Sequence, residues 1–165
     1  MTTPLGQGIT PAELPRDRAP APDSAPLDAA TIRAMVDGEQ GWIDRRIFWD
    51  PQGHALEMER IFARCWIFVA HDSQIPEVGD FVTTYVGEDA VIVARPRDRR
   101  VHAFINSCSH RGNRVCFTEA GSARRFTCNF HGWSYALDGS LSGVTAEELY
   151  KDNPSFDRSK LGLHN

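Results

Sequence analysis

The sequence predicts a mainly β protein: a β-sandwich preceded by two N-terminal helices and a disordered N-terminal extension. Short runs of β-branched and aromatic residues, separated by turn residues, follow residue 65 and are typical of sandwich strands. Helical patterns precede that residue, and six of the ten prolines lie within the first 27 residues. We therefore expect an extension over residues 1–27, a helical segment over 28–64 and a β domain over 65–163.

Composition limits the classes of function. The chain has 165 residues and a formal charge of −4, so it has no basic excess of the kind that binds nucleic acid. No apolar run approaches the roughly 20 residues that a membrane-spanning helix needs. The first residues contain acidic side chains and no apolar core of a signal peptide, so we expect a cytoplasmic location.

Two helices are expected before the β domain. Asp28 is a plausible N-cap of a first helix over residues 28–36, and Gly38 is a plausible stop. The second is expected over residues 51–64. Its apolar face would consist of Leu56, Met58, Ile61 and Phe62.

Strands are expected where the apolar period changes. The predicted strands cover residues 66–70, 81–86, 90–95 and 101–105. Residues 137–141 predict a hairpin with Asp138 and Gly139 in its turn, and residues 145–150 predict a short helix capped by Thr145.

The strongest chemical signal is a pair of short motifs on loops at strand ends. Cys108 and His110 form C-x-H, and Cys128 and His131 form C-x-x-H. Two thiolates on one iron and two imidazoles on the other are the ligand set of a Rieske [2Fe–2S] centre. The motifs therefore predict an electron-transfer site.

Structural zinc is the alternative for the same four ligands. Two cysteines and two histidines also satisfy tetrahedral zinc. Common zinc patterns pair cysteine with cysteine and histidine with histidine, whereas here the two types alternate, which favours iron and sulfur. A zinc-stapled interaction module would offer as its binding face Arg97, Arg99, Arg100, Arg111, Arg114, Arg124 and Arg125.

Residues around the motifs have expected roles too. Gly112 and Gly132 would let backbone N–H groups approach the sulfur atoms, and Trp133 would shield the cluster from water. Cys65 and Cys116 are expected to be small buried hydrophobes. The other histidines are expected to be structural or exposed: His54, His71, His102 and His164.

The flanks of both motifs resemble a known family. Residues 108–116, 126–135 and 137–139 resemble the Rieske iron–sulfur domain of aromatic-ring-hydroxylating dioxygenase α subunits, and residues 59–66 and 79–89 extend the similarity. The resemblance covers about residues 40–163. Respiratory Rieske proteins differ, because they carry a disulfide cysteine at the places of Asn113 and Phe130 and a hydrogen-bonding serine at that of Trp133. Fewer hydrogen bonds to sulfur predict a lower potential.

The resemblance implies an oxidoreductase that takes electrons from a ferredoxin or reductase. It would pass them to a mononuclear Fe(II) in a catalytic domain or neighbouring α subunit of an oligomer, for the breakdown of aromatic hydrocarbons. In that family two histidines and a carboxylate hold the Fe(II), and no suitable histidine pair remains here. We therefore assign no catalytic residue and expect the catalytic domain to be absent and this chain alone to be inactive in hydroxylation. A stand-alone Rieske-type electron carrier is the alternative.

Overall fold

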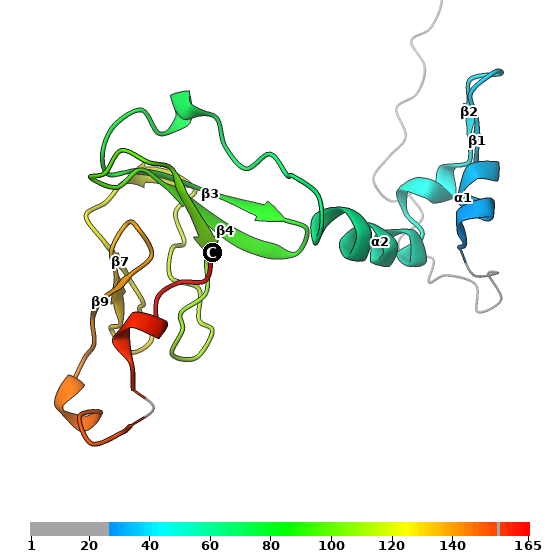
Figure 1. Cartoon of the computed structure of the whole chain (residues 1–165). Coiled ribbons are helices and arrows are strands. Elements are labelled where there is room, and N and C mark those ends of the chain that lie inside the picture. Colours follow the sequence, from blue (N-terminus) through cyan, green and yellow to red (C-terminus); the bar gives the residue numbers. More distant parts are fainter. Residues whose placement is uncertain (1–26, 155) are drawn as a thin grey trace, which may run out of the picture. The chain divides into compact units, whose positions relative to one another are not determined.

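The computed structural model describes residues 27–154 and 156–165. The chain divides after Arg64 into two compact units, and each is described by itself (Figure 1). The extension predicted over residues 1–27 lies outside the described residues apart from Leu27, which is buried.

The first unit begins with helix α1 (Ala29–Ala34). Asp28 caps it as predicted, since its Oδ1 accepts a hydrogen bond of 2.7 Å from the Thr31 N–H. The helix ends before residue 36, however. Strand β1 (Val36–Asp37) pairs there with β2 (Trp42–Ile43), and Gly38 lies in the hairpin turn instead of ending a helix.

The second predicted helix is present almost in full. After the turn η2 (Arg45–Phe48), α2 (Pro51–Glu57) continues directly into one π-helical stretch, η3 (Met58–Phe62). Asp50 caps α2 by accepting from the Gln52 N–H at 2.9 Å. Ile61, which was expected on the apolar face, is 46% exposed.

The second unit contains two antiparallel sheets, which confirms the mainly β fold class (Figure 1). The larger sheet has the order β5-β4-β3-β6, with β3 (Asp80–Val86), β4 (Asp89–Ala94), β5 (His102–Ile105) and β6 (Ala120–Ser122). The smaller has the order β7-β8-β9, with β7 (Phe126–Thr127), β8 (Ser134–Tyr135) and β9 (Leu141–Gly143). The predicted hairpin is the β8–β9 connection, where Gly139 has a φ of 85°.

The main core contains residues from both sheets. Phe81, Ile92 and Phe104 of the larger sheet belong to one buried cluster with Phe126 and Tyr135 of the smaller. Strand alternation places Val82, Val91 and Val93 in a second cluster with Ile75. The larger sheet is thus covered on both faces.

The prediction of a strand over residues 66–70 is wrong, because the segment forms no strand. Trp66 and Phe68 are 103% and 77% exposed, while Val69 and Ala70 pack on the second buried cluster. Strand propensity predicted extended backbone, but this segment lies against a sheet face and finds no strand to pair with.

Short turns complete the unit. They are η4 (Asp72–Gln74), η5 (Glu147–Leu149) and η6 (Arg158–Lys160). The helix predicted over residues 145–150 is thus a single 3-10 turn, and Thr145 does not cap it, because Ala146 precedes it in a left-handed conformation with φ of 52°.

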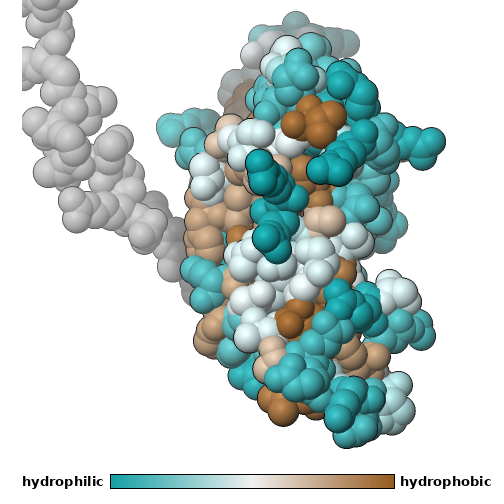
Figure 2. Space-filling view, turned by 90° about the vertical axis from the view of Figure 1, so that its left-hand side faces the viewer, coloured by the Kyte–Doolittle hydropathy of each residue, from teal (hydrophilic) through white to brown (hydrophobic). Residues whose placement is uncertain are grey.

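Within the described residues, no helix is long and apolar enough to cross a bilayer. Figure 2 shows one face of the molecule, on which strongly hydrophobic residues form separate spots among hydrophilic and intermediate ones.

Candidate metal centre

Two loops with the same backbone hydrogen bonds carry the four predicted ligands. In the first ligand loop (residues 108–113), the Cys108 N–H donates to the Asn113 carbonyl at 2.8 Å, and the Gly112 N–H donates back to the Cys108 carbonyl at 2.7 Å. The second ligand loop (residues 128–133) repeats both bonds, at 2.8 and 3.0 Å. Each cysteine is therefore fixed by a closed turn.

Glycine is required in these turns by backbone conformation. Gly112 and Gly132 have φ values of 71° and 76°, a region that other L-residues rarely adopt. A Cβ atom on Gly132 would also collide with Thr145 Oγ1. The N–H groups of both glycines bond carbonyl oxygens, so the glycines shape the loops and other N–H groups reach the sulfur.

The two predicted thiolate ligands are buried in the main core. Cys108 and Cys128 are 3% and 2% exposed. Burial raises the pKa of the Cys128 thiol, but hydrogen bonds from the Phe130 N–H, the Asn113 amide and the His131 N–H outweigh burial, and the pKa lies below its ordinary value. A further hydrogen bond to Cys108 places the two sulfur atoms together. The site thus favours thiolate at Cys128.

Tyr135 completes the surroundings of Cys108. Its Oη lies 3.1 Å from Cys108 Sγ and accepts from the Ser109 N–H at 3.1 Å. Burial, followed by the hydrogen bond to Cys108, raises the pKa of the phenol. The hydroxyl therefore keeps its proton and can donate it to a thiolate.

The two imidazoles also lie together. The ring centroids of His110 and His131 are 4.7 Å apart, with the rings at 75°. Trp133 stacks on His110 at 4.8 Å and 10°, and Phe130 packs on His131 at 4.0 Å. Burial, then the charges of His131 and Arg111, lower the pKa of His110, which favours the neutral, metal-binding form.

His131 carries the most direct sign of a missing partner. Its Nδ1 is buried and has no hydrogen-bond partner. Buried polar atoms without a partner are rare, because leaving one unsatisfied costs about 1–3 kcal/mol. An iron bound at this nitrogen would satisfy it, so the residues present fit the cluster that the motifs predict.

The side chains of the predicted ligands are grouped in pairs. Within residues 27–154 and 156–165, no three His, Cys, Asp or Glu side chains are grouped so that they could hold one metal ion. Structural zinc needs four protein ligands around one ion, whereas each iron of a Rieske centre takes only two from the protein. Here the thiols of Cys108 and Cys128 form one pair, and the imidazoles of His110 and His131 form another.

Two anchoring residues were not found by sequence reasoning. Tyr135 was only part of a motif flank, and Asn106 was only the residue after a strand. Asn106 is 4% exposed; its Oδ1 accepts from the N–H groups of Val115 and Cys116, and its Nδ2 donates to the Cys116 carbonyl at 2.7 Å. A polar residue directly after a buried strand was the available signal for Asn106.

The remaining cysteines and histidines differ from one another. Cys116 is buried as predicted, but Cys65 is exposed, so its expected role as a buried hydrophobe is wrong. The apolar neighbours of Cys65 in the sequence misled the prediction, since several of them are themselves exposed. All four cysteines lie in the described part of the chain, and none forms a disulfide. His71 caps η4, and His102 lies 3.2 Å from Asp98.

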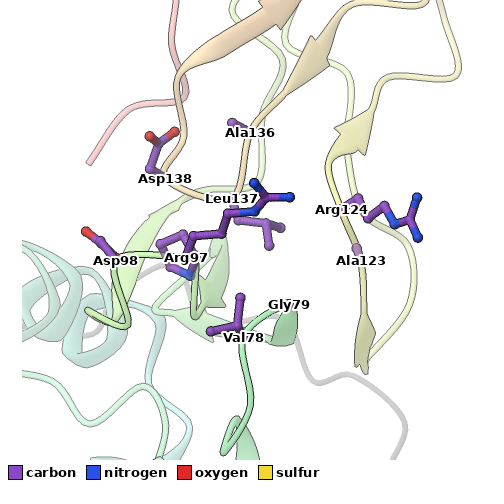
Figure 3. A pocket seen from close by; sticks show the side chains of 10 residues that line it. Val78, Gly79, Arg97, Asp98, Ala123, Arg124, Ala136, Leu137 and Asp138 are labelled. Atoms are coloured by element: carbon purple, nitrogen blue, oxygen red, sulfur yellow. The ribbon is translucent and has the colours of Figure 1, made fainter.

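A cavity of about 500 Å³ lies away from the ligand loops and is lined by none of the four predicted ligands (Figure 3). Arg97 extends across it toward Leu137. The two carboxylates that line the cavity both accept hydrogen bonds. Asp98 accepts from the Arg100 N–H, and Asp138 accepts from the N–H and hydroxyl of Ser140.

Known proteins are similar to this chain over the residues that contain the two ligand loops. The family described as the Rieske [2Fe-2S] domain matches residues 65–153. The biphenyl dioxygenase subunit alpha of Metapseudomonas furukawaii is 43% identical over 136 residues, covering 79% of this chain and 30% of that protein. The benzene 1,2-dioxygenase subunit alpha of Pseudomonas putida is 45% identical over 120 residues, covering 73% and 27%.

Solved structures show the same similarity. Naphthalene 1,2-dioxygenase from Rhodococcus sp. has a TM-score of 0.68 and 41% identity, covering 74% of this chain and 28% of that one. A quaternary ammonium Rieske monooxygenase has a TM-score of 0.64 and 32% identity, covering 72% and 33%. The chain thus spans about 30% of the length of the curated relatives it matches.

Proposed function

The chain belongs to the Rieske [2Fe-2S] domain family, and from this premise we propose that residues 65–163 are the electron-transfer domain of an aromatic-ring-hydroxylating dioxygenase α subunit. The observation that carries the proposal is the buried, unpartnered Nδ1 of His131 beside a second imidazole and two adjacent buried thiols. On this proposal, residues 28–64 form a separate helical segment.

The ligand assignment follows from the pairing of side chains. Cys108 and Cys128 would hold one iron as thiolates, and His110 and His131 would hold the other through one ring nitrogen each, Nδ1 in the case of His131. When bound, the cluster supplies a one-electron redox couple.

The surrounding side chains hold these ligands and exclude water. Trp133, which is 3% exposed, orients the ring of His110 by stacking. The ring edges of Tyr150 and Phe156 in turn fix Trp133, at 6.1 and 6.2 Å. Tyr135 would donate its hydroxyl proton to a Cys108 thiolate. Rigid support of this kind keeps ligand positions constant between redox states.

The partners are proposed from the relatives. Because the matched proteins are alpha subunits of dioxygenases, we assign the electron donor to a ferredoxin or reductase and the acceptor to a mononuclear iron outside these residues. That iron would lie in a catalytic domain or in a neighbouring α subunit of an oligomer. His110 and His131 are only half-buried, so their rings offer an exit for the electron.

The test is the composition of the purified 165-residue chain. It should contain about two irons and two acid-labile sulfides, absorb in the visible range and give an EPR signal of average g below 2 after reduction. One zinc per chain without colour would end the proposal. The protein alone should form no diol from an aromatic compound, O₂ and a matched reductase.

A further inference from the structure

The side-chain amide of Asn113 lies between the two ligand loops. Its Nδ2 is 2.9 Å from Asn129 Oδ1 and 3.6 Å from Cys128 Sγ, both in the second loop. It is also 2.9 Å from the Arg114 carbonyl in its own chain segment. Contacts of an N–H with sulfur are longer than those with oxygen because the sulfur atom is larger.

We propose that Asn113 is a positioning residue. Its side-chain amide links the first ligand loop to the second and donates a hydrogen bond to the Cys128 sulfur. The inference rests on the proposed function, since it concerns the potential of the cluster that these loops would hold. It adds to that function by assigning two effects to the Asn113 side chain, one on the rate of cluster loss and one on the midpoint potential.

The first effect is mechanical. The two loops come from different places in the fold, one after β5 and the other between β7 and β8. The bond from Asn113 to Asn129 joins them at their outer side, where Asn129 is exposed. A link between two ligand-bearing loops slows the opening that lets a cluster escape, because both loops must separate together.

The second effect is electrostatic. Reduction adds an electron to the cluster, so a donor to a ligand sulfur stabilises the reduced form more than the oxidised form and raises the potential. An amide has two hydrogens, and here they serve three acceptors, so one hydrogen is shared. Removal of the Asn129 oxygen would leave one hydrogen for the Cys128 sulfur alone.

These two effects predict a difference between two matched variants. Asn113→Leu removes the bonds to Asn129 and Cys128 together with the bond to the Arg114 carbonyl. Its midpoint potential should therefore fall, and its cluster should be lost about tenfold faster to an iron chelator, the factor that matches one hydrogen bond of about 1.4 kcal/mol. Asn129→Leu removes only the link between the loops. Its cluster should also be lost faster, but its potential should not fall.

The double variant tests whether one bond is involved. Because both single variants break the same link, Asn113→Leu with Asn129→Leu should lose its cluster no faster than Asn113→Leu alone. The proposal would be overturned if the double variant lost its cluster faster by the product of the two single-variant factors. An unchanged midpoint potential in Asn113→Leu would also overturn it. If Asn113→Leu does not fold, Asn113→Ser removes the amide with a smaller change.

Iron and sulfide content is measured first, because it tests the proposed electron-transfer function separately from the role of Asn113. A wild-type chain without a cluster contradicts the proposed function. A wild-type chain with two irons and two sulfides, whose potential does not respond to Asn113, contradicts only the role of Asn113. Circular dichroism of each variant shows whether the loops alone have changed.

Discussion

Tyr135 joins the smaller sheet to the first ligand loop, with its Oη 3.1 Å from Cys108 Sγ. The same oxygen accepts from the Ser109 N–H, and its own proton can be donated to the sulfur when Cys108 is a thiolate. Tyr135 is fully buried, at 0% exposure, which removes water as a competitor for either bond. A tyrosine that packs as a core residue thus also serves the metal ligand.

Tyr135→Phe is expected to lower the midpoint potential while keeping the cluster. The phenyl ring fills the same space, and only the donor to Cys108 is lost. The free energy of unfolding should fall by about 1–2 kcal/mol, since one buried hydrogen bond is lost and the Ser109 N–H loses its acceptor. A redox titration followed by visible absorption, and a denaturant titration, measure the two effects; an unchanged potential would contradict the role of the hydroxyl.

Replacement of single ligands should abolish the visible spectrum. Cys108→Ala and His131→Ala would each leave one iron with one protein ligand, and within the described residues no third His, Cys, Asp or Glu side chain is grouped with either pair. Cys116→Ala and His102→Ala are matched controls, because these residues lie outside the ligand pairs and should retain the spectrum. If a ligand variant kept its colour, the assignment of that ligand would be wrong.

Gly132→Ala is expected to destabilise the second ligand loop. The added methyl group would meet Thr145 Oγ1, and the φ of 76° is unfavourable for alanine. Positive φ alone costs alanine about 1 kcal/mol or more. Gly143→Ala is the control, since its Cβ would meet Ser134 Cβ at an ordinary 3.7 Å. Thermal melting should show a lower Tm for Gly132→Ala only, and equal losses would indicate a general intolerance of the smaller sheet.

Asp138 should make stability depend on pH. Hydrogen bonds from the Ser140 hydroxyl and N–H hold the pKa of its carboxyl below the ordinary value, despite the opposing effect of burial. A pKa lower in the folded state than in the unfolded state stabilises the fold above the unfolded value, near 3.9, and this contribution is lost as pH falls through the folded value. The Tm difference between wild type and Asp138→Asn should therefore be largest near neutral pH and shrink in acid. A constant difference would exclude this linkage.

Local patterns in the sequence predicted the parts of the molecule that depend on local interactions. The cap at Asp28, the helix from residue 51 and the strands β3, β4 and β5 follow from capping groups and apolar period, and all are present. The segment 66–70 has the composition of a strand, but pairing depends on distant neighbours, which composition does not reveal. The prediction for Cys65 was wrong for a similar reason, because the burial of a side chain depends on distant residues that pack against it.

At the candidate site, too, local features could be predicted and contacts between distant residues could not. Ligand identity could be predicted because cysteine and histidine at fixed spacing have few other uses, and residues 108–113 and 128–133 are each local turns. The contacts from Tyr135 to Cys108 and from Asn113 to Asn129 join positions 27 and 16 residues apart, and no short motif encodes them. The lower potential expected from Trp133 in place of serine stays a prediction. The contacts of Tyr135 with Cys108 and of Asn113 with Cys128 act against it.

Removal of the metal should loosen the ligand loops before the sheets. Cluster binding is available only to the folded state, so chelation removes that stabilisation and leaves the Nδ1 of His131 buried without a partner. The apoprotein should therefore melt at a lower temperature than the holoprotein. Hydrogen exchange should rise at the Cys108, Gly112, Cys128 and Gly132 amides, whose bonds close the two loops. Amides of β3 and β4, which lie in a sheet buried on both faces, should stay protected, and a rise there equal to that in the loops would show that the cluster supports the whole domain instead.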